Sequence, residues 1–258
     1  MPSGKEWHRA ELIVAFNLYC KVPFGQLHKS NPLIIQLADK LDRTPSSVAM
    51  KLVNFASLDP THKNRGVRGL SHASTSDRQI WEEFNGNWER LSYESQKAFN
   101  KLIAQPLYDE MLDRAEQLID KPTETEKEST VRVRLVQSFF RETVLSSYSF
   151  SCSMCRLSIA KLLNASHIIP WSVEKKRRGD PTNGLSLCVL HDRAFDRGLL
   201  SIDDKYRMIL SKELKMGYRN DLYKVAFLSL EGNKIMLPEK FKPDLTALAY
   251  HRQKIFLR

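Results

Sequence analysis

Residues 152–198 read CSMCRLSIAKLLNASHIIPWSVEKKRRGDPTNGLSLCVLHDRAFDRG, and this stretch carries the strongest pattern in the chain. It opens with the pair Cys152-x-x-Cys155 and returns, 33 residues later, to the pair Cys188-x-x-His191. Two short-spaced pairs joined by a long excursion are a common way for one chain to build a tetrahedral zinc site. Four protein ligands leave no position for water, so the spacing predicts a structural zinc ion. The alternative is two buried cysteines beside an unrelated pair.

The composition around this stretch is typical of a folded, water-soluble protein. With 258 residues, 42% of them apolar, the chain is too long and too apolar for a disordered tail. No apolar run approaches the roughly 18 residues that a membrane span requires, and the N-terminal MPSGKEWHRA lacks a signal-peptide core. We therefore expect a cytoplasmic protein with no membrane partner. Four cysteines in a chain of this length do not indicate a disulfide scaffold.

Charge is distributed unevenly along the chain. The net charge of +10 divides into +5 over residues 1–76, −6 over residues 77–129 and +11 over residues 130–258. Two basic blocks that flank an acidic connector are typical of a protein whose two ends contact a polyanion. Ordinary surface charge is the alternative interpretation.

The N-terminal part is predicted to be helical. Apolar residues recur at helical spacing over residues 8–22, and two more helices are expected within residues 31–60, separated by a break at residues 42–45. Thr44 is a good N-cap, and Pro45 suits the first position of the helix that follows. This pattern indicates a helix-turn-helix, although generic helix packing produces the same pattern.

A helix-turn-helix presents short polar and basic side chains of its second helix to the major groove. The candidates for this role, together with phosphate-binding residues in the loop at 61–77, are Ser46, Ser47, Lys51, Asn54, Lys63, Arg65 and Arg68. We expect Trp81, Phe84 and Trp88 to lie in the core rather than to stack on bases, and Cys20 to be buried in an apolar helix.

These observations predict an α+β protein. A mainly helical domain occupies residues 1–105, and a helical and then polar linker occupies residues 106–130. A mixed domain of short strands and helices follows at residues 131–258.

The excursion between the two zinc pairs contains Ala165-Ser-His167-Ile-Ile-Pro-Trp171, then a basic loop, and then Asn183-Gly-Leu-Ser-Leu-Cys188. In combination with the following LHDRAFDRG, this segment resembles the HNH endonucleases. The resemblance covers about residues 132–258, including an upstream helix with Gln137, Phe140 and Arg141. It implies a ββα-metal fold, in which a β-hairpin and one helix hold a single divalent metal ion.

The resemblance also implies roles for individual residues. His167 matches the general base that takes a proton from the attacking water, and Asn183 matches the asparagine that fixes the hairpin. Asp192, nine residues after Asn183, occupies the place of the last letter of the motif and would bind catalytic Mg²⁺, Mn²⁺ or Ni²⁺. His191 then stands where the family has its second zinc cysteine. A rival assignment makes His191 the ligand of the catalytic metal.

One position departs from the family pattern. Many members have Asp directly before the base histidine as a further metal ligand, whereas this chain has Ser166. Asp196 or water would then complete the coordination. Beside this site we expect phosphate contacts from the basic residues Lys175, Lys176, Arg177, Arg178 and Arg193.

The resemblance implies a metal-dependent endonuclease of the restriction-like or defence type, with a structural zinc ion. Its N-terminal domain would read a sequence or a modified base in double-stranded DNA. A homodimer is expected, because one active site cuts one strand at a time. The alternative is a DNA-binding or regulatory protein with a degenerate, non-cleaving HNH fold. A nuclease that acts on RNA or structured DNA is a third, less favoured interpretation.

Overall fold

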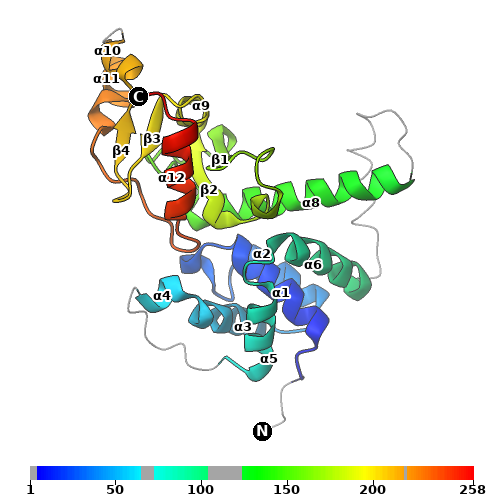
Figure 1. Cartoon of the computed structure of the whole chain (residues 1–258). Coiled ribbons are helices and arrows are strands. Elements are labelled where there is room, and N and C mark those ends of the chain that lie inside the picture. The colour runs from blue at the N-terminus through cyan, green and yellow to red at the C-terminus, as the bar shows by residue number, and fades with distance from the viewer. Residues whose placement is uncertain (1–4, 65–72, 104–123, 218–219) are drawn as a thin grey trace. The chain divides into compact units, whose positions relative to one another are not determined.

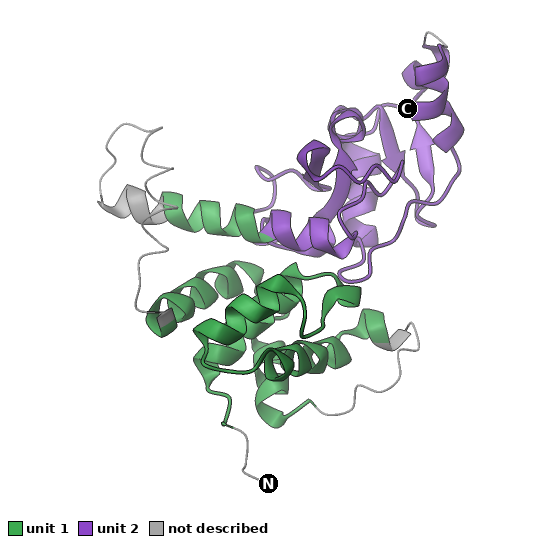
Figure 2. Ribbon diagram, turned by 180° about the vertical axis from the view of Figure 1, so that it is seen from behind, with its two compact units in different colours: residues 1–139 green, residues 140–258 purple. Residues whose placement is uncertain are grey.

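A computed structural model of the chain describes residues 5–64, 73–103, 124–217 and 220–258 (Figure 1). The chain divides into two compact units, Met1–Phe139 and Phe140–Arg258 (Figure 2). The long helix α8 (Glu124–Ser147) runs through this division, so residues 124–130 of the expected linker are helical. The remaining residues of the expected linker, 106–123, lie outside the described residues. Helical and hairpin elements together confirm the α+β class.

Unit 1 is built from helices around an aromatic core. Phe16 of α1 packs against Phe55 and Trp81, with ring centroids 4.9 and 5.3 Å away. Trp81, Phe84, Trp88 and Cys20 are all buried, as predicted. The helices are α1 (Arg9–Lys21), α2 (Pro32–Lys40), α3 (Pro45–Leu58), α4 (Pro60–Asn64), α5 (Thr75–Phe84) and α6 (Trp88–Ile103), with a 3₁₀ turn at Phe24–Gln26 and the first part of α8.

The break between α2 and α3 has the predicted local chemistry. The hydroxyl of Thr44 accepts a hydrogen bond from the main-chain N–H of Ser47 at 3.2 Å, and Pro45 opens α3. Pro45 has no N–H to leave unpaired, so both residues favour a helix start at this point. None of the described helices has the length and apolar character that a membrane-spanning helix needs.

Unit 2 contains two small antiparallel hairpins and short helices. Strand β1 (Leu163–His167) pairs with β2 (Gly184–Cys188), and β3 (Leu200–Ile202) pairs with β4 (Met208–Leu210). The helices are α9 (Val189–Asp196), α10 (Lys212–Met216), α11 (Asp221–Ala226) and α12 (Leu245–Lys254), and 3₁₀ turns lie at Ala160–Leu162, Lys175–Arg177, Pro181–Asn183 and Leu228–Leu230.

The first hairpin lies between α8 and α9. A Cβ atom on Gly184 would lie 2.4 Å from Cγ2 of Val144, so only glycine lets β2 approach α8 this closely. Phe140 and Val144 of α8 share one core cluster with Leu185 and Leu187 of β2. Helix α9 follows directly on β2 and packs on both strands, which completes a ββα unit (Figure 1).

Gly198, after α9, is required for the attachment of the C-terminal segment. Its φ is +69°, its carbonyl accepts a hydrogen bond from the N–H of Leu257, and a Cβ atom would lie 2.1 Å from the carbonyl oxygen of Ile255. We expect Gly198→Ala to lower the free energy of unfolding by about 2–4 kcal/mol, because it combines backbone strain with a main-chain clash. Urea unfolding measures this loss. Gly232→Ala is the matched control, since Gly232 has φ +77° but open space around it. Equal losses for both variants would contradict a role for the Ile255 contact.

His251 of α12 is a buried histidine with a structural role. Its Nε2–H donates to the carbonyl of Phe195 at 3.0 Å, and the hydroxyl of Ser201 donates to its Nδ1 at 2.8 Å. Burial lowers the pKa of His251 to about 4.

This low pKa predicts acid sensitivity. Below pH 6.5 the unfolded chain protonates this histidine and the folded chain does not, so stability falls as the pH drops toward 4. The loss from this one group should reach about 3 kcal/mol. Thermal unfolding of wild type and His251→Gln from pH 7.5 to 4 tests it. The difference between the two proteins should shrink as the pH falls, and a constant difference would contradict the prediction.

Candidate active site and metal centre

Four side chains of unit 2 converge as the Cys-His spacing predicts. The ligand atoms of Cys152, Cys155, Cys188 and His191 all lie within 4.8 Å of one another, and this is the one such Cys/His/Asp/Glu group among the described residues. Cys188 Sγ lies 3.2 Å from His191 Nδ1 and 3.9 Å from Cys155 Sγ. Around a tetrahedral zinc ion, with bonds of about 2.0–2.3 Å, neighbouring ligand atoms are about 3.5–3.8 Å apart. The cluster therefore fits a zinc ion.

Local backbone structure brings the ligands together. Cys152 and Cys155 lie in a tight turn after α8, in which the N–H of Arg156 donates to the carbonyl of Cys152 at 3.0 Å. Arg156 has a φ of +67°, which lets the turn close just after the second cysteine. Cys188 ends β2 and precedes α9, so His191 follows one helical turn later.

The ring of His191 is oriented for binding through Nδ1. Its Nε2–H donates to the carbonyl of Ala226 at 2.8 Å, so Nδ1 faces the sulfur atoms of Cys152 and Cys188. Burial lowers the pKa of His191, but the two sulfur atoms more than offset this and raise it to about 10. A metal ion must displace that proton in order to bind. This orientation favours the zinc assignment of His191 over the rival one.

His167, the last residue of β1, is held on two sides. Its ring stacks on Phe140 with centroids 3.7 Å apart and planes 10° apart, and the ring of Trp171 meets it edge-on at 5.5 Å. His167 Nε2 lies 3.0 Å from the carbonyl oxygen of Arg178. A carbonyl only accepts, so Nε2 carries the proton and Nδ1 carries the lone pair. Burial lowers the pKa of His167, which favours the neutral imidazole at pH 7.

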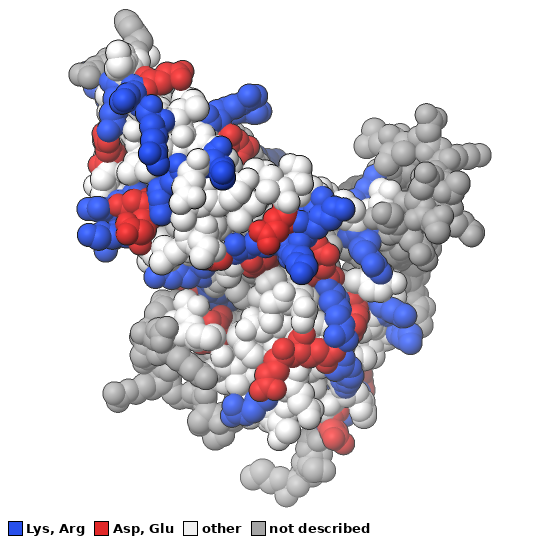
Figure 3. Space-filling view, in the orientation of Figure 1, with Lys and Arg blue, Asp and Glu red and all other residues white. Residues whose placement is uncertain are grey.

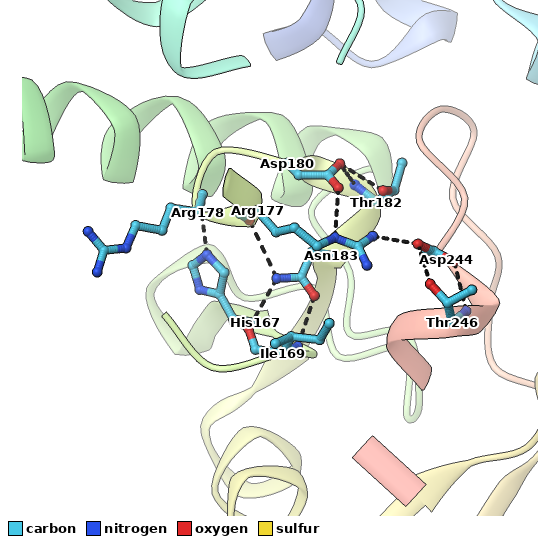
Figure 4. A network of polar contacts seen from close by, with 9 residues as sticks. All are labelled: His167, Ile169, Arg177, Arg178, Asp180, Thr182, Asn183, Asp244 and Thr246. Carbon is cyan, nitrogen blue, oxygen red and sulfur yellow. Dashed lines mark hydrogen bonds and ion pairs between the residues drawn. The ribbon is translucent and has the colours of Figure 1, made fainter. Parts of the chain in front are cut away.

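Asn183 closes the loop that joins the two strands (Figure 4). The side chain is buried, with 1% exposed. Its Oδ1 accepts from the N–H of Ile169 at 2.8 Å, and its Nδ2 donates to the carbonyl of Ile169 at 3.1 Å. Its own carbonyl accepts from the N–H of Ile168 at 2.9 Å. These bonds fix the backbone immediately after His167.

Two carboxylates lie one turn apart on α9. Asn164 of β1 donates to Asp192 at 2.7 Å. Burial raises the pKa of Asp196, and the negative charge of Asp192 raises it further, against the opposing effects of Arg193 and Ser166. The buried hydroxyl of Ser166 has no aligned hydrogen-bond partner among the described residues, although it lies close enough to Asp196 to affect its pKa. Carboxylate and hydroxyl oxygens are donors of the type that hard divalent cations prefer.

The basic loop does not behave as a uniform set of phosphate ligands. Lys175 and Lys176 are exposed, as is Arg193 on α9. Arg178 donates from Nε to the carbonyl of Trp171 at 3.0 Å and stacks over its ring. Arg177 differs from the predicted phosphate contact. Its guanidinium forms ion pairs with Asp180 and Asp244, and its side chain is only 15% exposed.

A second correction concerns the expected DNA-reading helix α3. Lys51 is buried, and its ammonium lies 2.8 Å from Asp77, a residue to which Asn54 also donates. This pairing leaves Lys51 unavailable to a phosphate. Ser46 is exposed and Ser47 half-buried. The side chain of Lys63, and Arg65 and Arg68 entirely, lie outside the described residues. On the visible face, basic side chains are interspersed with acidic ones rather than gathered in one patch (Figure 3).

Sequence reasoning missed three contributors to the site. These are Asn164, which orients Asp192, and the carboxylates Asp180 and Asp244, which bind Arg177. Asp180 carried a local signal, because Asp before Pro-Thr is typical of the start of a helical turn. Asp244 lies 67 residues from Arg177 and had no such signal.

Comparison with known proteins supports the assignment that the geometry suggests. The family model of the HNH endonucleases (HNH_2) matches residues 152–203. Among curated proteins no match to the chain was found. The matched segment contains the whole ββα unit, all four zinc-site residues and His167, Asn183 and Asp192. Residues 152–203 of the chain therefore match an HNH endonuclease domain.

Proposed function

We propose that this protein is a metal-dependent endonuclease that hydrolyses phosphodiester bonds of double-stranded DNA, with His167 as the general base. The observation that carries the proposal is the state of the His167 ring. Its Nε2–H is bound to the Arg178 carbonyl, and burial keeps the ring neutral, so the lone pair on Nδ1 is the group that can accept a proton.

In the proposed reaction, Nδ1 of His167 takes a proton from a water molecule. The water oxygen then forms a bond to phosphorus while the bond from phosphorus to the leaving sugar oxygen breaks. Stacking on Phe140 and the bonds of Asn183 hold the imidazole in place, so little ordering is needed at the moment of reaction.

Asp192 and Asp196, with the hydroxyl of Ser166, are the residues that would hold the catalytic cation, either Mg²⁺, Mn²⁺ or Ni²⁺. A bound divalent cation offsets the negative charge that develops on the phosphate and the leaving oxygen. Asn164 restrains Asp192 by its 2.7 Å hydrogen bond. The zinc ion in the separate Cys-His cluster would have a structural role only.

Unit 1 is proposed to select the substrate as a restriction-like or defence nuclease does, by reading a sequence or a modified base. The α2–α3 pair supports this, with Ser46 and Ser47 at the start of α3. Because Lys51 is buried, this reading must rely on short polar groups and on other basic residues. Cleavage of both strands further requires two active sites, so we propose a homodimer on DNA.

One observation favours a second candidate function, namely a DNA-binding protein that does not cut. Ser166 supplies a hydroxyl where many family members have a carboxylate, and a hydroxyl binds divalent cations more weakly. Such a protein would retain its affinity for DNA and gain no activity from any metal.

The test is cleavage of supercoiled plasmid, unmodified or with modified cytosine or adenine, in Mg²⁺, Mn²⁺ or Ni²⁺. Competition by single-stranded DNA and RNA at one fixed salt concentration defines the class of nucleic acid. Nicked or linear product from one of these plasmids, absent with His167→Ala, supports the proposal. Tight binding to DNA without cleavage in any metal would overturn it in favour of the non-cleaving protein.

A further inference from the structure

The guanidinium of Arg177 joins two separate parts of unit 2. Its Nε lies 3.2 Å from Asp180, and its terminal nitrogen lies 2.6 Å from Asp244 (Figure 4). Both carboxylates are themselves fixed, because Asp180 accepts from the N–H of Thr182 and Asp244 accepts from the N–H of Thr246 at the start of α12. Arg177 therefore ties the loop between β1 and β2 to a helix far along the chain.

The main chain at the same point is directed toward the proposed base. The carbonyl of Arg177 accepts from Nδ2 of Asn183 at 3.4 Å, and the next carbonyl, that of Arg178, accepts from Nε2 of His167 at 3.0 Å. This stretch follows a three-residue 3₁₀ turn, with bonds of 3.3 Å from Arg178 N to Lys175 O and from Asp180 N to Arg177 O. Neither of these two main-chain bonds involves the Arg178 carbonyl that contacts His167.

We infer that Arg177 is a positioning residue for His167, whose guanidinium, held between Asp180 and Asp244, fixes the Arg178 carbonyl against His167 Nε2. This inference rests on the proposed role of His167 as the base. A misplaced carbonyl would free Nε2 and allow the proton to move to Nδ1, the atom that must accept one. Arg177 would then affect the chemical step without touching DNA.

This role differs measurably from the phosphate contact that a basic loop suggests. A lost phosphate contact raises KM, and it reduces the slope of log binding constant against log salt concentration by about one. A lost positioning contact lowers kcat, by about 10-fold or more, and leaves the salt dependence unchanged. The exposed neighbour Lys176 provides the comparison, and we expect Lys176→Gln to raise KM instead.

The experiment compares Arg177→Gln, Arg177→Lys and Asp244→Asn in the full-length, zinc-loaded protein. Arg177→Gln and Asp244→Asn change the local charge in opposite directions, so a purely electrostatic effect on DNA binding would have opposite signs in the two variants. Both should lower kcat if positioning is lost, and Arg177→Lys should rescue it in part. Arg207→Gln, which removes an exposed ion pair with Asp203, should leave kcat unchanged.

The second readout is the tautomer of His167, measured from the ¹⁵N shifts of its ring and assigned with His167→Gln. Wild type should show the Nε2–H form, and Arg177→Gln should show a mixture of both forms. An unchanged tautomer with unchanged kcat in Arg177→Gln would overturn the inference. If wild type cuts no DNA, the proposed function fails, and the tautomer alone decides whether Arg177 positions the ring. Should Arg177→Gln fail to fold, Asp244→Asn provides the same two measurements.

Discussion

Replacing His167 with Ala should lower kcat for DNA cleavage by about 10²–10⁴-fold, the usual contribution of a positioned general base. Affinity for DNA should stay within about threefold of wild type, because the ring is partly buried against Phe140 and acts on water rather than on the phosphate backbone. The measurement is single-turnover cleavage of the plasmid that wild type cuts, with binding followed separately in the absence of divalent cations.

His28→Ala is the matched control, since it removes an exposed histidine from unit 1 and should cut at the wild-type rate. The pH profile gives a further check. The base must be neutral to accept a proton, and burial lowers the pKa of His167, so the rate should hold below pH 6.5 and decline only at more acidic pH. Cleavage by His167→Ala at the wild-type rate would remove this residue from the mechanism.

The parts of the site that were predictable from sequence depend on short spacings. Cys152 and Cys155 lie on one turn, and Cys188 and His191 lie at the junction of β2 and α9, so the ligand spacing already encodes the geometry. Pro45 after Thr44 likewise determines where α3 begins. In each case the determining contacts lie within a few residues, where local backbone rules apply.

Long-range ion pairs were not predictable. Lys51 and Arg177 look like phosphate ligands in the sequence, but their partners Asp77 and Asp244 lie 26 and 67 residues away. Nothing local to a basic side chain shows whether the fold will bring a carboxylate to it. The division between the units has no local signal for another reason, because it falls inside the continuous helix α8, which begins within the polar segment at residues 124–130.

Removal of zinc is expected to unfold unit 2 and leave unit 1 folded. The ligands come from the turn after α8, the end of β2 and the first turn of α9, and His191 also holds Ala226 at the end of α11. Structural zinc sites contribute about 10–16 kcal/mol of apparent binding free energy, which is comparable to the whole stability of a typical domain, about 5–15 kcal/mol. Without the ion, three sulfur atoms and an imidazole remain crowded within 4.8 Å with no common partner.

Cys188→Ser tests this, with zinc content measured by atomic absorption and the indole NMR signals used as local probes. Of the four tryptophans, Trp171 reports on unit 2, and Trp81 and Trp88 report on the core of unit 1. We expect the variant to lose its zinc and the folded signal of Trp171, with Trp81 and Trp88 unchanged. Cys20→Ser controls for the loss of a buried thiol, and should keep one zinc ion per chain because Cys20 lies in α1. A folded Trp171 signal in zinc-free Cys188→Ser would mean that the apolar core around Phe140, Leu185 and Phe195 is sufficient to hold the hairpin against α9.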